Sequence, residues 1–109
     1  MTNTILADFL IKKGDAYYCR YGDLYIDPLD PVKTAVVSHA HGDHASPGHQ
    51  TTFSTPFTIS FMEHRFSKYP KEGYQTKGFG ESWMIGAVKL TLFPAGHILG
   101  SAQILMEYN

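Results

Sequence analysis

Four residues with metal-binding side chains lie within six positions in the first half of the chain: His39, His41, Asp43 and His44. Imidazole nitrogens and carboxylate oxygens bind Zn²⁺ at about 2.0–2.2 Å and need no thiolate beside them. The same donors are compatible with Mn²⁺ and Fe²⁺. The cluster therefore predicts a site for divalent cations, with Zn²⁺ favoured.

The spacing of the cluster favours two ions rather than one. In extended backbone, residues two apart point to the same side, so His39 and His41 can converge on one ion. Gly42 permits a tight turn that aims Asp43 and His44 at a second point, and paired metal ions lie about 3.5–4 Å apart. The alternative is a surface loop rich in histidine that binds nothing. It is disfavoured because the loop directly follows an apolar strand.

The elements that must position the cluster are short strands. Thr34–Val37 is β-branched and apolar, which predicts a strand buried on both faces and leading straight into His39. Leu24–Ile26 predicts an earlier strand that ends at Asp27. Further strands are expected at 51–54, at 82–85 and 88–93 around a two-residue turn, and at 101–108.

One helix is predicted, over residues 56–68, with Pro56 in its first turn. One side of it carries Phe57, Phe61, His64 and Arg65, and an adjoining side carries Ile59, Met62 and Phe66. We expect His64 at the edge of the core. The stretch 73–80 is rich in glycine and is expected to be irregular. The pattern indicates an α/β (α+β) fold of mostly short strands with one clear helix.

Composition limits the classes of function. The chain has 109 residues, 43% hydrophobic and 17% charged, which is typical of one globular domain or part of one. Its net charge of -1 gives no basic field for nucleic acid, so phosphate contacts must come from a local site. The single Cys19 fits a reducing compartment, and neither a membrane span nor a signal peptide is evident. We therefore expect a cytoplasmic protein.

The sequence Ser-His-Ala-His-Gly-Asp-His around the cluster resembles the H-x-H-x-D-H signature of the metallo-β-lactamase superfamily. The resemblance implies an αββα sandwich. It implies that His39 and His41, with a later histidine, hold one metal ion, and that Asp43 and His44 hold the other. The later histidine is expected at a strand end after a glycine, which here is His97.

The resemblance also assigns roles beyond the first metal ion. Asp27 lies where the superfamily has an aspartate that steadies the histidine loop by hydrogen bonding behind the ligands. Asp43 and His44, as ligands of the second ion, carry the catalytic assignment, although Asp43 is not assigned as a general base. No residue is assigned to substrate binding.

Two further segments narrow the resemblance to the nuclease branch. Ala-Gly-His-Ile-Leu-Gly-Ser-Ala, around His97, is similar to β-CASP-like messenger-RNA 3′-end processing factors. Gly-Asp-Leu-Tyr-Ile-Asp-Pro, ending at Pro28, is similar to bacterial ligase-associated DNA exonucleases. The implied activity is phosphodiester hydrolysis with two divalent metal ions. The implied partners are single-stranded DNA or RNA and a DNA ligase, in the cytoplasm or at the nucleoid.

The superfamily also uses a bridging aspartate and a further histidine later in the chain, and its nuclease branch has a cap domain. None of these has a counterpart before Asn109. We therefore expect residues 1–109 to be the N-terminal half of such a domain, with five ligands and partial metal occupancy. An unfinished sheet edge would also allow a dimer.

Two alternatives stay open. One is a hydrolase of the same fold acting on small esters or thioesters, against which Gly-Ser-Ala-Gln at 100–103 argues. The other is a non-catalytic metal-binding module whose partner supplies the second half.

Outside the cluster, His49 is expected to be solvated or at a helix end. The tyrosine-rich segment 17–25 is expected to pack into the core rather than to stack on bases.

Overall fold

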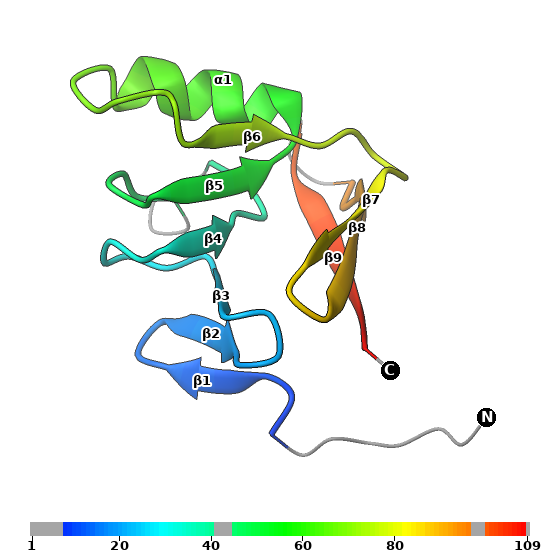
Figure 1. Ribbon diagram of the computed structural model, residues 1–109. Coiled ribbons are helices and arrows are strands. Elements are labelled where there is room, and N and C mark those ends of the chain that lie inside the picture. Colours follow the sequence, from blue (N-terminus) through cyan, green and yellow to red (C-terminus); the bar gives the residue numbers. More distant parts are fainter. Residues whose placement is uncertain (1–7, 41–44, 97–99, 109) are drawn as a thin grey trace.

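The computed structural model describes residues 8–40, 45–96 and 100–108. These residues form one helix and nine strands, and the strands lie in two sheets. Figure 1 shows the two sheets packed against each other, with the helix at one end of the larger sheet. The predicted α/β (α+β) class is therefore confirmed.

The larger sheet has six strands in the order in which they occur along the chain. β1 to β3 pair antiparallel, whereas β3 to β6 pair parallel. The carboxyl ends of the four parallel strands therefore meet at one edge. The strands are β1 (Ile11–Lys13), β2 (Ala16–Cys19), β3 (Leu24–Ile26), β4 (Thr34–Val36), β5 (Thr51–Ser54) and β6 (Tyr74–Thr76).

The smaller sheet is an antiparallel meander. β7 (Ser82–Ile85) and β8 (Val88–Pro94) form the predicted hairpin, and β9 (Ala102–Tyr108) returns along β8. Every second residue of β8 points inward at its start: Val88 and Leu90 are fully buried, whereas Lys89 is exposed. This alternation fixes the register of the strand, because a slip of one residue would expose the apolar set.

The helix α1 (Pro56–Arg65) begins where its sequence provides a cap. The Thr55 side chain accepts a hydrogen bond from Thr58 N at 3.3 Å, and Pro56 lacks an N–H that would need a partner. The helix ends at Arg65 and not at Lys68, so the predicted end was three residues too late. The C-cap is Phe66, whose φ of -110° and ψ of 45° lie outside helical backbone.

One of the two adjoining sides predicted for α1 is buried, and the other is exposed. Ile59 and Met62 are buried, whereas Phe57 and Phe61 are 45% and 50% exposed. His64, expected at the edge of the core, is exposed. The helix therefore packs through the Ile59 and Met62 side against the larger sheet, at β5 and β6, and the expectation for His64 was wrong.

The main core lies between the two sheets. Cys19, Leu24 and Val36 of the larger sheet face Leu90 and Leu92 of the smaller one, and all five are fully buried. Close packing of such side chains is the dominant favourable contribution to folding. Cys19 acts here as a small hydrophobic residue, as expected for a buried free cysteine.

A second, smaller cluster lies under α1 on the other face of the larger sheet. Val37, Ala45 and Met62 are buried there, with Phe66 and Tyr74 packed against them. Ala35, Val36 and Val37 are all fully buried, which confirms a strand covered on both faces. This double covering makes the carboxyl end of β4 a rigid support for Ser38 and His39.

The two edge strands of the larger sheet, β1 and β6, were not predicted. β6 lies inside the stretch 73–80 that was expected to be irregular, and β1 has only three exposed residues. Both are short edge strands, so neither has the apolar run that reveals a strand in a sequence. These two segments are strands because each pairs with one neighbouring strand, and not because their own residues favour a strand.

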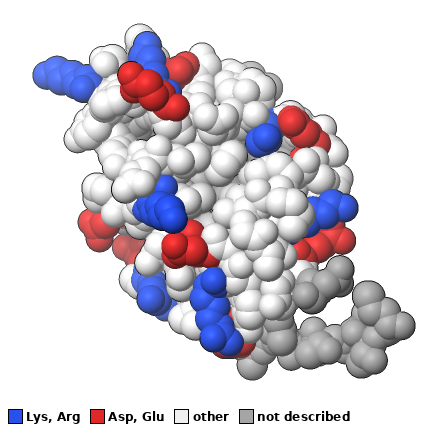
Figure 2. All heavy atoms as spheres, in the orientation of Figure 1, with Lys and Arg blue, Asp and Glu red and all other residues white. Residues whose placement is uncertain are grey.

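Figure 2 shows acidic and basic side chains mixed over the visible face, without a large basic patch. Among the described residues, no helix combines the length and the apolar character needed to cross a membrane.

Candidate functional site

Asp27 lies directly after β3 and is bonded to the end of β4. Its backbone N–H donates to the carbonyl oxygen of Val36 at 3.0 Å. Its carboxylate accepts two hydrogen bonds from Ser38, from the backbone N–H to Oδ1 and from the hydroxyl to Oδ2, each at 2.7 Å. The aspartate therefore holds Ser38, the residue that precedes His39, by two hydrogen bonds, and it holds the end of β4 by a third, to Val36.

His39 is half-buried and lies beside the same serine. The Oγ atom of Ser38 is 2.9 Å from Nδ1 of the imidazole. Asp27, Ser38 and His39 thus form a continuous hydrogen-bonded row at the carboxyl edge of the parallel strands. A histidine that binds a metal usually has such a partner on its other ring nitrogen.

The strand that comes after residue 97 returns to this edge. The N–H of Ala102, the first residue of β9, donates to the carbonyl oxygen of Ser38 at 2.8 Å. On the approach to residue 97, the N–H of Ala95 donates to the carbonyl oxygen of Ser101 at 3.1 Å. Ala95, before residues 97–99, is therefore bonded to Ser101, after them. Ser101 directly precedes Ala102, which bonds Ser38.

The start of α1 holds Gly100 in place. The hydroxyls of Thr55 and Thr58 both donate to its carbonyl oxygen, at 2.7 and 3.1 Å. Gly100 has a φ of 82°, and a Cβ atom there would lie 2.7 Å from a ring carbon of Phe57. Only glycine suits both the left-handed backbone and the close ring.

Most of the predicted ligands lie outside the described residues: His41, Asp43, His44 and His97. Of the predicted site, the structure places His39 and Asp27. Within 8–40, 45–96 and 100–108, no group of three or more His, Cys, Asp or Glu side chains is arranged to hold a metal ion. The dinuclear centre therefore stays a prediction.

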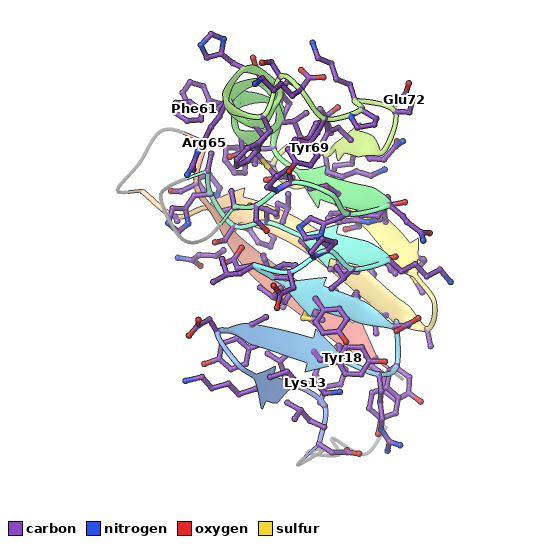
Figure 3. All side chains as sticks on the ribbon, turned by 90° about the vertical axis from the view of Figure 1, so that its left-hand side faces the viewer. Lys13, Tyr18, Phe61, Arg65, Tyr69 and Glu72 are labelled. Carbon is purple, nitrogen blue, oxygen red and sulfur yellow. The ribbon has the colours of Figure 1, made fainter. Side chains whose placement is uncertain are left out.

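The structure adds residues that the sequence analysis did not assign to the site. Arg65, at the end of α1, donates to the carbonyl oxygen of Ala40 at 3.4 Å, and Figure 3 shows it reaching from the helix toward the sheet. Thr55 and Thr58 contribute to the site indirectly, because their hydroxyls bond the carbonyl oxygen of Gly100. The Thr-Pro pair at 55–56 was a signal for a helix start, but nothing in the sequence linked it to residue 100.

His49 is neither solvated nor at a helix end, contrary to the prediction. It is half-buried, and its Nδ1 accepts a hydrogen bond from the N–H of Val32 at 3.1 Å. Burial lowers the pKa of this imidazole. The histidine therefore links the chain before β4 to the chain before β5.

A pocket of about 320 Å³ lies beside His49, between the loops that precede β5 and β6. Its lining includes Tyr69, Glu72 and Tyr74, and Figure 3 labels Tyr69 and Glu72, which belong to the loop between α1 and β6. Because the parallel strands β5 and β6 begin here, the pocket lies at the opposite edge of the sheet from Asp27 and His39.

The tyrosine-rich segment packs only partly into the core. Tyr21 contacts the main core, and its ring is tilted by 37° against that of Tyr108, with ring centres 4.3 Å apart. Tyr17 is 44% exposed. Tyr18 and Tyr25 contact each other on the outer face of the sheet, and the Lys13 ammonium lies 4.7 Å from the centre of the Tyr18 ring. Figure 3 shows Lys13 and Tyr18 together at that end.

No family model matches this chain. The chain is similar to a curated protein of Opitutus terrae described as a probable DNA ligase, with 36% identity over 100 residues. The similarity covers 91% of this chain but 10% of that protein. The chain therefore spans about a tenth of the length of the curated relative that it matches.

Proposed function

We propose that this chain is the N-terminal half of a metal-dependent nuclease of the metallo-β-lactamase superfamily that hydrolyses phosphodiester bonds in DNA. One observation carries the proposal: the Ala102 N–H donates to the Ser38 carbonyl oxygen at 2.8 Å. This bond joins the strand after His97 to the residue before His39. Backbone that flanks the two predicted ligand segments therefore meets at one edge of the sheet.

The residues fit a metal ion by their chemistry. His39 has a hydrogen-bonding partner on Nδ1, as ligating histidines usually do. His39, His41 and His97 would hold one ion, and Asp43 and His44 the second. Two such ions would supply hydroxide near neutral pH and would stabilise charge on the phosphoryl group.

The chain's own residues prepare this site before any ion arrives. Asp27 and Ser38 hold the backbone at the start of the histidine cluster, and the Thr55 hydroxyl holds Gly100 after residue 97. Such preorganisation limits the loss of freedom when ligand groups are brought together. The net charge of -1 also favours local recognition of phosphate over attraction by the whole surface.

DNA is favoured over RNA by the relative described as a probable DNA ligase. A nuclease that trims DNA ends and a ligase that joins them act on the same kind of substrate. We also propose such a ligase as the partner of the intact protein.

The first test is metal binding by residues 1–109, measured by calorimetry with Zn²⁺ and with Mn²⁺. We expect one ion to bind, because the ligands for the second ion in residues 1–109 are only Asp43 and His44. His41→Ala should weaken Zn²⁺ binding by about 10–100-fold or more. His64→Ala is the matched control, because His64 is exposed on α1, and it should leave the affinity unchanged.

The second test is activity of the gene product that carries this chain, on end-labelled single-stranded DNA, on RNA and on a thioester. We expect metal-dependent cleavage of DNA that His41→Ala abolishes and His64→Ala does not. Faster hydrolysis of the thioester would contradict the proposal and favour the small-ester alternative. Metal binding without turnover on any of the three would favour the non-catalytic module.

A further inference from the structure

Ser38 has every polar group engaged in a defined contact. Its N–H donates to Asp27 Oδ1 at 2.7 Å, and its carbonyl oxygen accepts from Ala102 N–H at 2.8 Å. Its hydroxyl donates to Asp27 Oδ2 at 2.7 Å. The serine is therefore fixed at both its backbone and its side chain, and its hydroxyl hydrogen points to the carboxylate.

This arrangement settles the role of the hydroxyl toward His39. A hydroxyl has one hydrogen to donate, and an ionised carboxylate can only accept. Since the hydrogen of Ser38 Oγ goes to Asp27, the same oxygen can only accept from Nδ1 of His39, 2.9 Å away. The neutral imidazole must then carry its hydrogen on Nδ1.

We propose that Ser38 is a positioning residue that holds His39 in the Nδ1–H tautomer and thereby presents its Nε2 lone pair to a metal ion. The metal part of this inference rests on the proposed function. Neutral imidazole in water prefers its hydrogen on Nε2, which is the wrong form for metal binding through that atom. The serine reverses this preference before any ion binds.

The order of the three residues excludes a hydrolytic triad. In a triad the histidine lies between the acid and the serine, and it takes the proton of the serine. Here the serine lies in the middle and donates to Asp27. Because Nδ1 of His39 already carries a hydrogen, it cannot serve as the base that activates Ser38 as a nucleophile.

The test compares Ser38→Ala with Ser38→Thr and with Ser54→Ala. Ser38→Ala removes the hydroxyl but keeps the backbone bonds to Asp27 and Ala102. Ser38→Thr restores a hydroxyl. Ser54→Ala is the matched control, because its buried hydroxyl donates to the Val37 carbonyl oxygen at 2.6 Å, at the same edge of the sheet.

The first readout is the ¹⁵N shifts of the His39 ring in the metal-free chain at pH 8. We expect a hydrogen on Nδ1 in the native chain, in Ser38→Thr and in Ser54→Ala, and a shift toward Nε2–H in Ser38→Ala. A native chain with the hydrogen on Nε2 overturns the proposal, and this measurement needs no variant to fold. A Ser38→Ala chain that is folded and keeps Nδ1–H also overturns it.

The second readout is the affinity for Zn²⁺. We expect Ser38→Ala to weaken it by about 10-fold or more, with Ser38→Thr restoring it. If the tautomer changes as expected but the native chain binds no Zn²⁺, the tautomer assignment is supported and the proposed function fails. If Zn²⁺ binds equally well to all variants, the positioning role is overturned and the proposed function stands.

Discussion

Asp27 has a backbone conformation that few residue types adopt. Its φ is 50°, in the left-handed region, where asparagine and aspartate are favoured among residues with a side chain. Its carboxylate at the same time accepts both bonds from Ser38. An aspartate meets both needs, since asparagine would accept through only one oxygen. A single residue therefore shapes the turn after β3 and supports the start of the histidine cluster.

His49 should make the stability of the chain depend on pH. Burial lowers its pKa in the folded state, so the unfolded chain binds a proton more readily. Its contribution to stability is therefore present above the unfolded pKa of about 6.5 and is lost as pH decreases through that value toward the folded pKa. Protonation of Nδ1 would also break the bond from Val32 N–H.

We expect urea denaturation between pH 7.5 and pH 5 to show stability decreasing with pH, and His49→Gln to reduce this dependence. His64→Gln is the control, since its side chain is exposed and should leave the slope as it is. If the free energy of unfolding of His49→Gln depended on pH as steeply as that of the native chain, His49 would not be the source of the pH dependence.

At the scale of elements, the beginning of α1 and the beginning of β9 depend on each other. Thr55 caps the helix through its oxygen and uses its hydroxyl hydrogen for Gly100. The helix packs on the larger sheet and β9 belongs to the smaller one. One side chain therefore joins elements of both sheets close to the candidate site.

The two glycines that flank residues 97–99 provide a matched pair for testing this junction. Both have positive φ, 91° at Gly96 and 82° at Gly100, but a Cβ atom at Gly96 would meet nothing within 4 Å. Gly96→Ala should cost about 1–2 kcal/mol from backbone strain alone. Gly100→Ala should cost about 1–3 kcal/mol more, because its methyl group meets Phe57.

Urea denaturation of the two variants measures the difference. Phe57→Ala introduced into Gly100→Ala should recover the additional loss, since it removes the ring that the methyl group meets. Equal free energies of unfolding for Gly96→Ala and Gly100→Ala would show that the ring moves away without cost.

The whole molecule is held together by the layer of side chains between the sheets. The sheets also touch through backbone at both ends: Ala87 N–H donates to the Tyr21 carbonyl oxygen at 3.2 Å, and Ala102 N–H to that of Ser38 at 2.8 Å. Neither sheet has another core of comparable size among the described residues. The two sheets should therefore unfold as one unit.

Leu90→Ala tests this cooperativity, because Leu90 is fully buried in the shared core. We expect it to lower the free energy of unfolding by about 2–5 kcal/mol. Leu105→Ala, at a 44% exposed position on the neighbouring β9, should change it by about 0.5 kcal/mol or less. Trp83 fluorescence and far-UV circular dichroism should give one shared transition. Two separate transitions would contradict a single cooperative unit.

Residue types and most local elements could be inferred from the amino-acid sequence alone. Local spacing and local apolar patterns predicted the histidine cluster, the strands before Asp27 and before Ser38, the hairpin at 82–93 and the helix. These features depend on contacts between neighbours in the chain, so periodicity alone reveals them. Local patterns did not reveal the short strands β1 and β6, or which of the two predicted sides of α1 is buried, because distant partners determine these features.

Long-range contacts settled which segments meet. The bonds from Ala102 to Ser38 and from Thr55 to Gly100 join residues far apart in the chain, and no local pattern encodes them. The direction of the Ser38 hydroxyl was likewise undetermined until Asp27 and His39 were placed on either side of it. A sequence states which side chains are present, whereas hydrogen-bond donors and acceptors acquire their roles from the partners that folding brings within reach.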